Sequence, residues 1–282
     1  KLVVFILEVF TIMNMMNKVE NILKTWCKKL FLYDVFRLEP TYGSVKGFFI
    51  MKKIYSFIFL FAMGISLNAQ KILFIGDSIT DGKWGYECDG TRNTDDMNHI
   101  FGHGYMYLIA AKYMAVYPDL AMQFYNRGVS GNTVKDLAER WDSDVLSVNP
   151  DVLSVLIGIN DVLNDNPSVD TVAFEKTYRE ILTKSRTQNS NLVILLGEPF
   201  CESGFRIDSE GVIRKKCEAL SRAVQRIAKD YDASFIPCQA FFDKLCKESG
   251  NTSYWIWDGV HPTPAGHYKM SVLWEQHLPT KK

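Results

Sequence analysis

The sequence has no excess of charge of either sign and no long run of like charges. Its 32 lysines and arginines are balanced by 32 aspartates and glutamates over 282 residues. A protein that holds nucleic acid or an anionic membrane surface usually carries a basic patch or tract for that purpose. We therefore expect no nucleic-acid partner.

Low-complexity tracts, internal repeats and Pro/Gly-rich linkers are also missing after residue 70. The composition, 47% hydrophobic and 23% charged, is that of a soluble globular protein with one substantial core. We expect a single domain over residues 70–282.

Cysteine spacings typical of metal sites are absent, because none of the six cysteines forms a C-x-x-C pair. The histidines form no ligand cluster either, so we expect no metal and no other cofactor. Disulfide pairing stays open, because it cannot be deduced from sequence. Cys201 with Cys217 and Cys238 with Cys246 are two candidate pairs, and buried free thiols are the alternative for these four and for Cys88.

The segment from Met51 has the pattern of a signal peptide. Two lysines follow Met51, an apolar stretch runs over residues 54–67, and Ala69 supplies a small residue at a cleavage point. The stretch is shorter than the roughly 20 residues that span a bilayer. We predict a signal peptide over residues 51–69, cleavage after Ala69, and a periplasmic or extracellular mature protein without stable membrane insertion; an uncleaved anchor or buried helix is the alternative. Residues 1–50, which begin at Lys1, are interpreted as an upstream extension.

Short apolar runs alternate with segments of helical period along the mature part. Runs of this continuous kind are typical of parallel strands covered on both faces by helices. The five runs cover residues 71–75, 122–125, 152–157, 192–196 and 234–236. The sequence therefore predicts an α/β protein, a three-layer α/β/α sandwich around a five-stranded parallel sheet.

Helical stripes separate these runs. Apolar residues recur at helical spacing over residues 174–182 and 213–227, and a last helix is predicted from Thr263, its N-cap, toward His277. Between the first strand and a helix containing residues 105–117 lies a long Gly-, Asp- and Asn-rich loop, residues 77–103. Loops of this length in compact domains are commonly functional.

Ser78 follows the first predicted strand directly, in Gly76-Asp77-Ser78. In an open parallel sheet, ligands bind at the carboxyl ends of the strands, so this serine hydroxyl is well placed as a nucleophile. A Gly-Asp-Ser tripeptide alone is more often a simple turn.

Asp258 and His261 lie three residues apart in the last long loop. At that spacing the carboxylate can hold the Nδ1 proton of the imidazole and leave Nε2 free to accept a proton from a hydroxyl. The alternative is a turn-capping aspartate beside a surface histidine.

Two further segments offer donors to an oxyanion. Gly128 follows the second strand and offers a backbone amide, and Asn160 follows the third and offers a side-chain amide. Taken singly, each is more often a loop residue. A parallel sheet would bring Ser78, Gly128, Asn160 and the loop of His261 to one edge.

The chain resembles the SGNH (GDSL-like) hydrolases, whose four sequence blocks match Gly76-Asp77-Ser78, Gly128, Gly158-x-Asn160-Asp161 and Asp258-x-x-His261. The resemblance covers residues 71–277 and implies a flavodoxin-like fold and a serine esterase. Ser78 would be the nucleophile, His261 the base and Asp258 its orienter. The oxyanion hole would comprise the amides of Ser78 and Gly128 and the side chain of Asn160. Ile79 replaces the family's leucine.

Aromatic residues flank these motifs. Trp84, Tyr86 and Trp257 are candidates for contact with a sugar ring, and half-buried packing is the alternative. The chain looks most like exported bacterial acylhydrolases and carbohydrate acetylesterases, so we expect a short acyl ester, O-acetyl above all, on a carbohydrate. A lipid-directed esterase of the lysophospholipase or acetylhydrolase type is the alternative, followed by a non-catalytic carbohydrate-binding protein on the same scaffold.

Overall fold

The computed structural model describes residues 69–86, 91–93, 99–164, 170–207 and 209–279. The predicted upstream extension, all but the last residue of the predicted signal peptide, and Cys88 lie outside the described residues.

A five-stranded parallel sheet forms the centre of the fold, in the order β2-β1-β3-β4-β5. This is the flavodoxin-like order of doubly wound sheets, and it confirms the predicted fold class. The strands are β1 (Lys71–Gly76), β2 (Gln123–Gly128), β3 (Val152–Leu156), β4 (Val193–Gly197) and β5 (Ser234–Ile236). Each begins within one residue of the start of a predicted apolar run. The register pairs the last residue of β1, Gly76, with Gly128 on one side and Leu156 on the other, so three strands end level beside Ser78.

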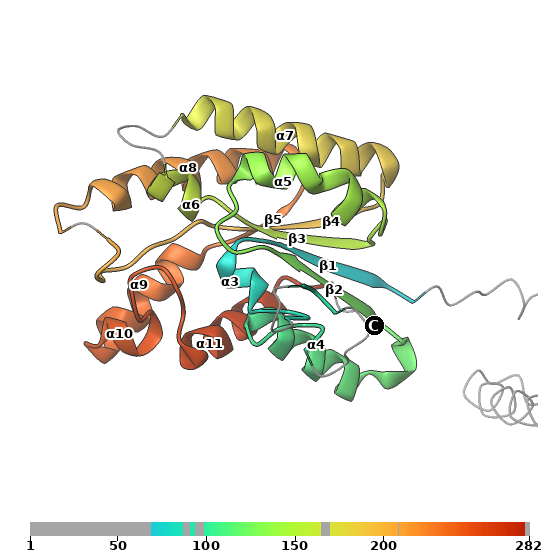
Figure 1. Cartoon of the computed structure of the whole chain (residues 1–282), viewed down its shortest axis with the longest axis horizontal. Helices are drawn as coiled ribbons and strands as arrows, with labels where there is room; N and C mark the ends of the chain where they lie inside the picture. The colour runs from blue at the N-terminus through green and yellow to red at the C-terminus, as the bar shows by residue number, and fades with distance from the viewer. Residues whose placement is uncertain (1–68, 87–90, 94–98, 165–169, 208, 280–282) are drawn as a thin grey trace, which may run out of the picture. The chain divides into compact units, whose positions relative to one another are not determined.

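Helices cover both faces of the sheet (Figure 1). One layer holds α5, α7 and α8, and the other holds α4, α9 and α11. The helical segments are α3 (Ser78–Asp81), α4 (Tyr105–Val116), a 3-10 turn (Pro118–Leu120), α5 (Val134–Trp141), a π-turn (Asp142–Leu146), α6 (Ile159–Asn164), α7 (Thr171–Gln188), α8 (Val212–Asp230), α9 (Cys238–Ser249), α10 (Thr252–Trp255) and α11 (Pro264–Glu275).

The burial of the strands follows from their position in the sheet. Every residue of β3 is buried, as expected for a central strand with helices on both faces. The edge strand β2 instead alternates between buried and more exposed residues. The continuous apolar runs of the sequence are thus the signature of the covered, central strands.

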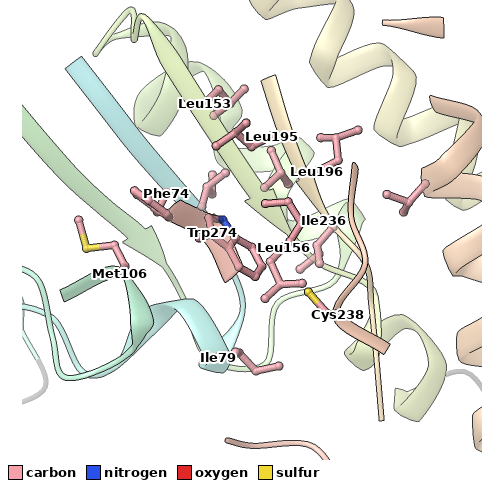
Figure 2. Close-up of a cluster of buried hydrophobic side chains, with 14 of the residues drawn as sticks. Phe74, Ile79, Met106, Leu153, Leu156, Leu195, Leu196, Ile236, Cys238 and Trp274 are labelled. Atoms are coloured by element: carbon pink, nitrogen blue, oxygen red, sulfur yellow. The ribbon is translucent and has the colours of Figure 1, made fainter. Parts of the chain in front are cut away.

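Trp274 of α11 anchors one helical layer on the sheet. Figure 2 shows its indole among leucines of β3 and β4 and Phe74 of β1. Its ring nitrogen donates to the hydroxyl of Ser154, a buried polar group in mid-strand, at 2.9 Å. A Cβ on Gly197 would lie 2.9 Å from the indole, so the glycine lets the large ring lie directly on the end of β4. This contact fixes α11, which begins immediately after the loop of His261.

The predicted helices are present, and several others were missed, of which α5 and α9 are the longest. Thr263 caps α11 as predicted, its hydroxyl accepting from the amide of Gly266 at 3.2 Å. The sequence analysis did not identify α5 and α9. The start of α5 carries a readable signal, a capping box between Thr133 and Asp136. None of the helices in the described ranges is long and apolar enough to cross a membrane.

Candidate active site

The turn of residues 76–81, called the nucleophile turn after the role predicted for Ser78, joins β1 to α3 and holds Ser78 as the first residue of that helix. The side chain of Asp77 caps the helix by accepting from the amide of Ile79 at 3.0 Å. A Cβ on Gly76 would lie 2.2 Å from the carbonyl oxygen of Leu156, so only glycine permits the strands to approach this closely here. The turn is therefore positioned mainly by the close packing of backbone.

The loop of residues 256–262, called the acid–base loop after the roles predicted for Asp258 and His261, lies opposite Ser78. The hydroxyl of Ser78 is 2.8 Å from Nε2 of His261, and Nδ1 of His261 is 2.7 Å from Oδ2 of Asp258. The loop is closed by an antiparallel bridge between Ile256 and Pro262. The structure therefore brings the three predicted residues into one hydrogen-bonded chain, with the imidazole between a hydroxyl and a carboxylate.

Asp258 is fully buried and held by several donors. Its Oδ1 accepts from the amides of Val260 and His261, at 2.9 and 2.7 Å. Burial raises its pKa, but the amide and ring of His261, together with the amide of Val260, more than offset this, and the pKa lies below the usual value. Arg206 adds an ion pair, with its Nε 2.8 Å from Oδ2. The carboxylate is thus kept ionised and oriented toward His261.

Asp77 is equally buried but behaves differently. One oxygen accepts from Ile79, whereas Oδ2 is buried with no hydrogen-bond partner in the part of the chain that the structure describes. Burial, reinforced by the nearby charges of Asp161 and Asp81, raises the pKa of Asp77 to about 7 despite the amide hydrogen bond. This aspartate therefore titrates near neutrality.

Gly128 does not offer its amide to the site, which corrects the sequence prediction for this residue. The amide donates to Oδ1 of Asn126 at 2.9 Å. A Cβ at this position would lie 2.3 Å from the amide nitrogen of Asp81, so the absence of a side chain at Gly128 allows β2 to contact α3 closely. The sequence motif correctly identifies a position at the sheet edge that requires glycine, but glycine is required there for close packing and not as a hydrogen-bond donor to the site.

Gly131, three residues further on, differs from Gly128 in that no described residue engages its amide. It is exposed, has φ +87°, and its amide makes no hydrogen bond to any described residue. Its neighbours fix it beside the site: Ser130 donates to Asp81 of α3 through amide and hydroxyl at 3.0 and 2.6 Å. On the other side, the carbonyl of Asn132 accepts from Nδ2 of Asn160 at 3.0 Å. Gly131 is thus held between α3 and Asn160.

Asn160 is the second residue of α6 and is partly exposed. One hydrogen of its Nδ2 group is used by the bond to Asn132, and an amide nitrogen carries two. The other has no partner among the described residues. The amide of Ser78 likewise has no partner among the described residues.

The predicted aromatic contacts divide into two groups. Trp84 is only 8% exposed, its ring nitrogen donates to the carbonyl of Gly128 at 2.8 Å, and Arg92 and Arg127 lie against the ring. The expectation of a substrate contact is therefore corrected for Trp84, which packs under the site. Tyr86 and Trp257 are both 52% exposed.

Trp257 has a partner that the sequence analysis missed. The ring of Phe205, from the loop between β4 and α8, meets it edge to face at 5.2 Å between centroids, and Phe205 is 73% exposed. The residue next to Trp257 is Asp258, so this aromatic pair stands at the rim of the acid–base loop. A lone Phe in a loop gives no sequence signal, and only the fold joins it to Trp257.

Two other groups of titratable residues lie outside the hydrogen-bonded chain of Ser78, His261 and Asp258. The ring of His267, on α11, accepts from the amide of Tyr105 through Nδ1 at 3.2 Å. Burial, together with the charges of His103 and His261, lowers the pKa of His267 to about 4. Cys201, Cys217, Cys238 and Cys246 are buried free thiols, so neither candidate pair is bonded. Across the described residues, no group of histidine, cysteine and carboxylate side chains could hold a metal ion.

Comparison with known proteins gives consistent matches over the same region. The model of the GDSL-like lipase/acylhydrolase family matches residues 74–269. An acetylxylan esterase from Geobacillus stearothermophilus is 34% identical over 208 residues, which cover 71% of this chain and 90% of the relative.

Solved structures of family members also match this chain over about three quarters of its length. A GDSL-like lipase from Parabacteroides merdae superposes with a TM-score of 0.66 at 31% identity, covering 74% of this chain and 95% of that one. A catalytic mutant of the Geobacillus stearothermophilus acetylxylan esterase superposes with a TM-score of 0.65 at 30% identity, covering 75% and 95%.

Proposed function

Because the chain belongs to the GDSL-like lipase/acylhydrolase family and is an esterase, we propose that it is an exported acetylesterase that removes acetyl groups from a carbohydrate by way of Ser78. The observation that carries the proposal is the unbroken chain from the Ser78 hydroxyl through His261 to Asp258, with contacts of 2.8 and 2.7 Å.

The proposed reaction has two acyl-transfer steps. His261 accepts the proton of the Ser78 hydroxyl as the oxygen attacks the ester carbonyl, and then donates that proton to the sugar oxygen, which leaves as a hydroxyl. The same histidine next takes a proton from water as the water oxygen attacks the acetyl-serine, and returns it to the Ser78 oxygen as the acyl–oxygen bond breaks and acetate is released. Asp258 holds Nδ1–H of His261 throughout, so that Nε2 faces the reacting oxygen.

We assign the oxyanion hole to the amides of Ser78 and Gly131 and to the side chain of Asn160. The assignment of Gly131 in place of Gly128 is supported by two observations: the amide of Gly128 is engaged by Asn126, whereas Gly131 is exposed and its amide has no partner among the described residues. Each such donor is worth roughly 3 to 4 kcal/mol of transition-state stabilisation in well-studied hydrolases.

Two observations support a carbohydrate substrate. The curated relative at 34% identity is an acetylxylan esterase, and the chain covers 90% of its length. The exposed pair of Phe205 and Trp257 offers aromatic surface at the rim of the site, and an aromatic face suits the C–H surface of a pyranose ring.

Export is supported by the sequence pattern that ends at Ala69. The first strand begins at Lys71, so cleavage after Ala69 leaves every strand in the mature chain. Comparing the N-terminal residue of protein recovered from the periplasm or medium with that of whole-cell protein tests this point; an N-terminus other than Gln70, or retention in the cytoplasm, contradicts it.

The catalytic proposal is tested with residues 70–282 and the Ser78→Ala variant. We expect the protein to release acetate from acetylated xylo-oligosaccharides and to cleave p-nitrophenyl acetate, and we expect the variant to lose at least about 10⁴-fold in kcat. Full activity in the variant would overturn the mechanism. A preference for p-nitrophenyl esters of long acyl chains would instead favour a lipid substrate.

The carbohydrate proposal is tested with Trp257→Ala and a matched exposed aromatic, Tyr117→Ala, which follows the last residue of α4 and is 44% exposed in the parent chain. Loss of a stacking surface should raise KM for acetylated xylo-oligosaccharides about tenfold while changing p-nitrophenyl acetate cleavage less than about twofold. An equal effect on both substrates, or in both variants, would contradict a sugar-binding role.

A further inference from the structure

Arg206 shares one carboxylate oxygen of Asp258 with His261. Its Nε lies 2.8 Å from Oδ2 of Asp258, and Nδ1 of His261 lies 2.7 Å from the same oxygen. Asp258 is fully buried, whereas the side chain of Arg206 is 51% exposed. A fixed positive charge therefore contacts the carboxylate that orients the proposed base.

The position of Arg206 is set by the backbone of its own loop. The amide of Arg206 donates to the carbonyl of Asp258 at 3.1 Å, and the amide of Glu202 donates to the carbonyl of Gly259 at 2.8 Å. At Gly204 a Cβ would lie 2.3 Å from the carbonyl carbon of Asp258, so the two loops touch through their backbones. The segment 202–206 is thus bound to the acid–base loop, and Arg206 is held at Asp258 by more than its own ion pair.

The charge of Arg206 acts against protonation of His261. When His261 accepts a proton, the imidazolium and the guanidinium become two cations that share one carboxylate oxygen, and they repel each other at short range. We infer that Arg206 is a positioning residue that keeps His261 neutral, and so able to act as the base, at a lower pH than the Asp258–His261 pair alone would allow. This inference rests on the proposed role of His261.

Other groups near His261 would not account for a change in its protonation between the variants. The hydroxyl of Ser78 faces it from α3, Asp258 faces it from its own loop, and His267, on whose charge His103 also acts, acts on it from α11. His267, with a pKa of about 4, stays neutral between pH 5 and 9. All of these groups remain when Arg206 alone is replaced, so a difference between variants reports Arg206.

The first test is the pH dependence of kcat/KM for p-nitrophenyl acetate in Arg206→Gln, Arg206→Lys and Arg226→Gln. Arg226 is a comparably exposed arginine on α8 that pairs with Glu175, away from the site. We expect the acid limb to move up by about 0.5 to 1 pH unit in Arg206→Gln. Arg206→Lys, which keeps the charge, should move it by less than half as much, and Arg226→Gln should leave it unchanged.

Several outcomes would overturn the inference: an unmoved acid limb in Arg206→Gln, with or without a loss of activity at all pH values; the same shift in Arg226→Gln; or a lysine variant that behaves like the glutamine variant. A purely structural role for Arg206 predicts the first of these.

A second measurement does not depend on turnover. The ring resonance of His261, assigned by its loss in His261→Asn, is titrated by NMR in a Ser78→Ala background with and without Arg206→Gln. The same upward displacement of the titration supports the inference, and its absence overturns it. If the protein cleaves no ester but the displacement is present, the proposed function fails while the effect of Arg206 on His261 stands.

Discussion

The nucleophile turn and the acid–base loop reach the same point in space by different means. The turn is positioned by backbone packing, in which Gly76 and Gly128 allow contacts that no side chain would permit. The loop is positioned by the hydrogen bonds of Asp258, the Ile256–Pro262 bridge and the ion pair with Arg206. The turn should therefore be sensitive to added volume, and the loop to changes in charge.

The two aspartates beside the site give the same contrast in electrostatic terms. Asp77 is 1% exposed and Asp258 0%, yet the pKa of Asp77 is raised to about 7 and that of Asp258 is lowered. Burial acts in the same direction on both. Asp258 has donors to both of its oxygens, whereas Oδ2 of Asp77 has no partner among the described residues. The number of donors, and not depth alone, decides whether a buried carboxylate stays ionised.

Gly128→Ala is the variant that we expect to disrupt the packing of the nucleophile turn most strongly. The added methyl would lie 2.3 Å from the amide nitrogen of Asp81 and 2.6 Å from its Cα, both backbone atoms that cannot move away independently. We expect the free energy of unfolding to fall by at least about 3 kcal/mol, a fall of about 10 °C in Tm or no folding at all. Thermal unfolding followed by circular dichroism measures this.

The matched control is Gly250→Ala, where nothing lies within 4 Å of the added Cβ and only the positive φ of 63° opposes the change. It should cost about 1 kcal/mol. Equal losses in the two variants would show that the close approach at Gly128 is not what holds the turn.

Gly131→Ala tests whether the loop between these two regions contributes to the reaction. Gly131 and Gly211 both have positive φ, +87° and +74°, and open space around an added Cβ. The two alanine variants should therefore lose similar stability, about 1 kcal/mol. Because strain at Gly131 would turn its amide away from the proposed oxyanion, we expect kcat for p-nitrophenyl acetate to fall roughly 10- to 100-fold in Gly131→Ala and less than about twofold in Gly211→Ala. Equal kcat values in the two would exclude Gly131 as a donor.

The sequence allowed the fold and the Ser78–His261–Asp258 arrangement to be predicted because both leave local signals. Continuous apolar runs mark the covered strands, and the three-residue spacing of Asp258 and His261 lies within one loop. The sequence analysis wrongly predicted Gly128 as an oxyanion-hole donor, because a glycine that permits close backbone contact and a glycine that presents its amide look alike in sequence. Arg206 and Phe205 were missed because they come to the site only when two loops far apart in the chain pack together.

The last prediction concerns the ionisation of Asp77. Its pKa is raised from its ordinary value of 3.8 to about 7, so the folded state holds the proton more tightly than the unfolded state. The stabilisation from the protonated form is complete below about pH 4 and is lost as the pH rises through 7. In Asp77→Asn the side chain is neutral at every pH and still accepts from the amide of Ile79. Relative to the parent, the variant should therefore gain about 2.5 kcal/mol in unfolding free energy between pH 5 and pH 8, measured by urea denaturation at both pH values.

Asp136→Asn provides the contrast for that measurement, because Asp136 caps α5 through Thr133 and its pKa is lowered, first of all by the Thr133 hydroxyl. A group with a lowered pKa contributes stability that disappears only below about pH 4, so the cost of Asp136→Asn should be the same at pH 5 and pH 8. If Asp77→Asn behaved in this way as well, Asp77 would be ionised in the folded protein across the whole range. The buried Oδ2 would then have to be satisfied by water, and the nucleophile turn would resemble the acid–base loop in depending on polar contacts for its position.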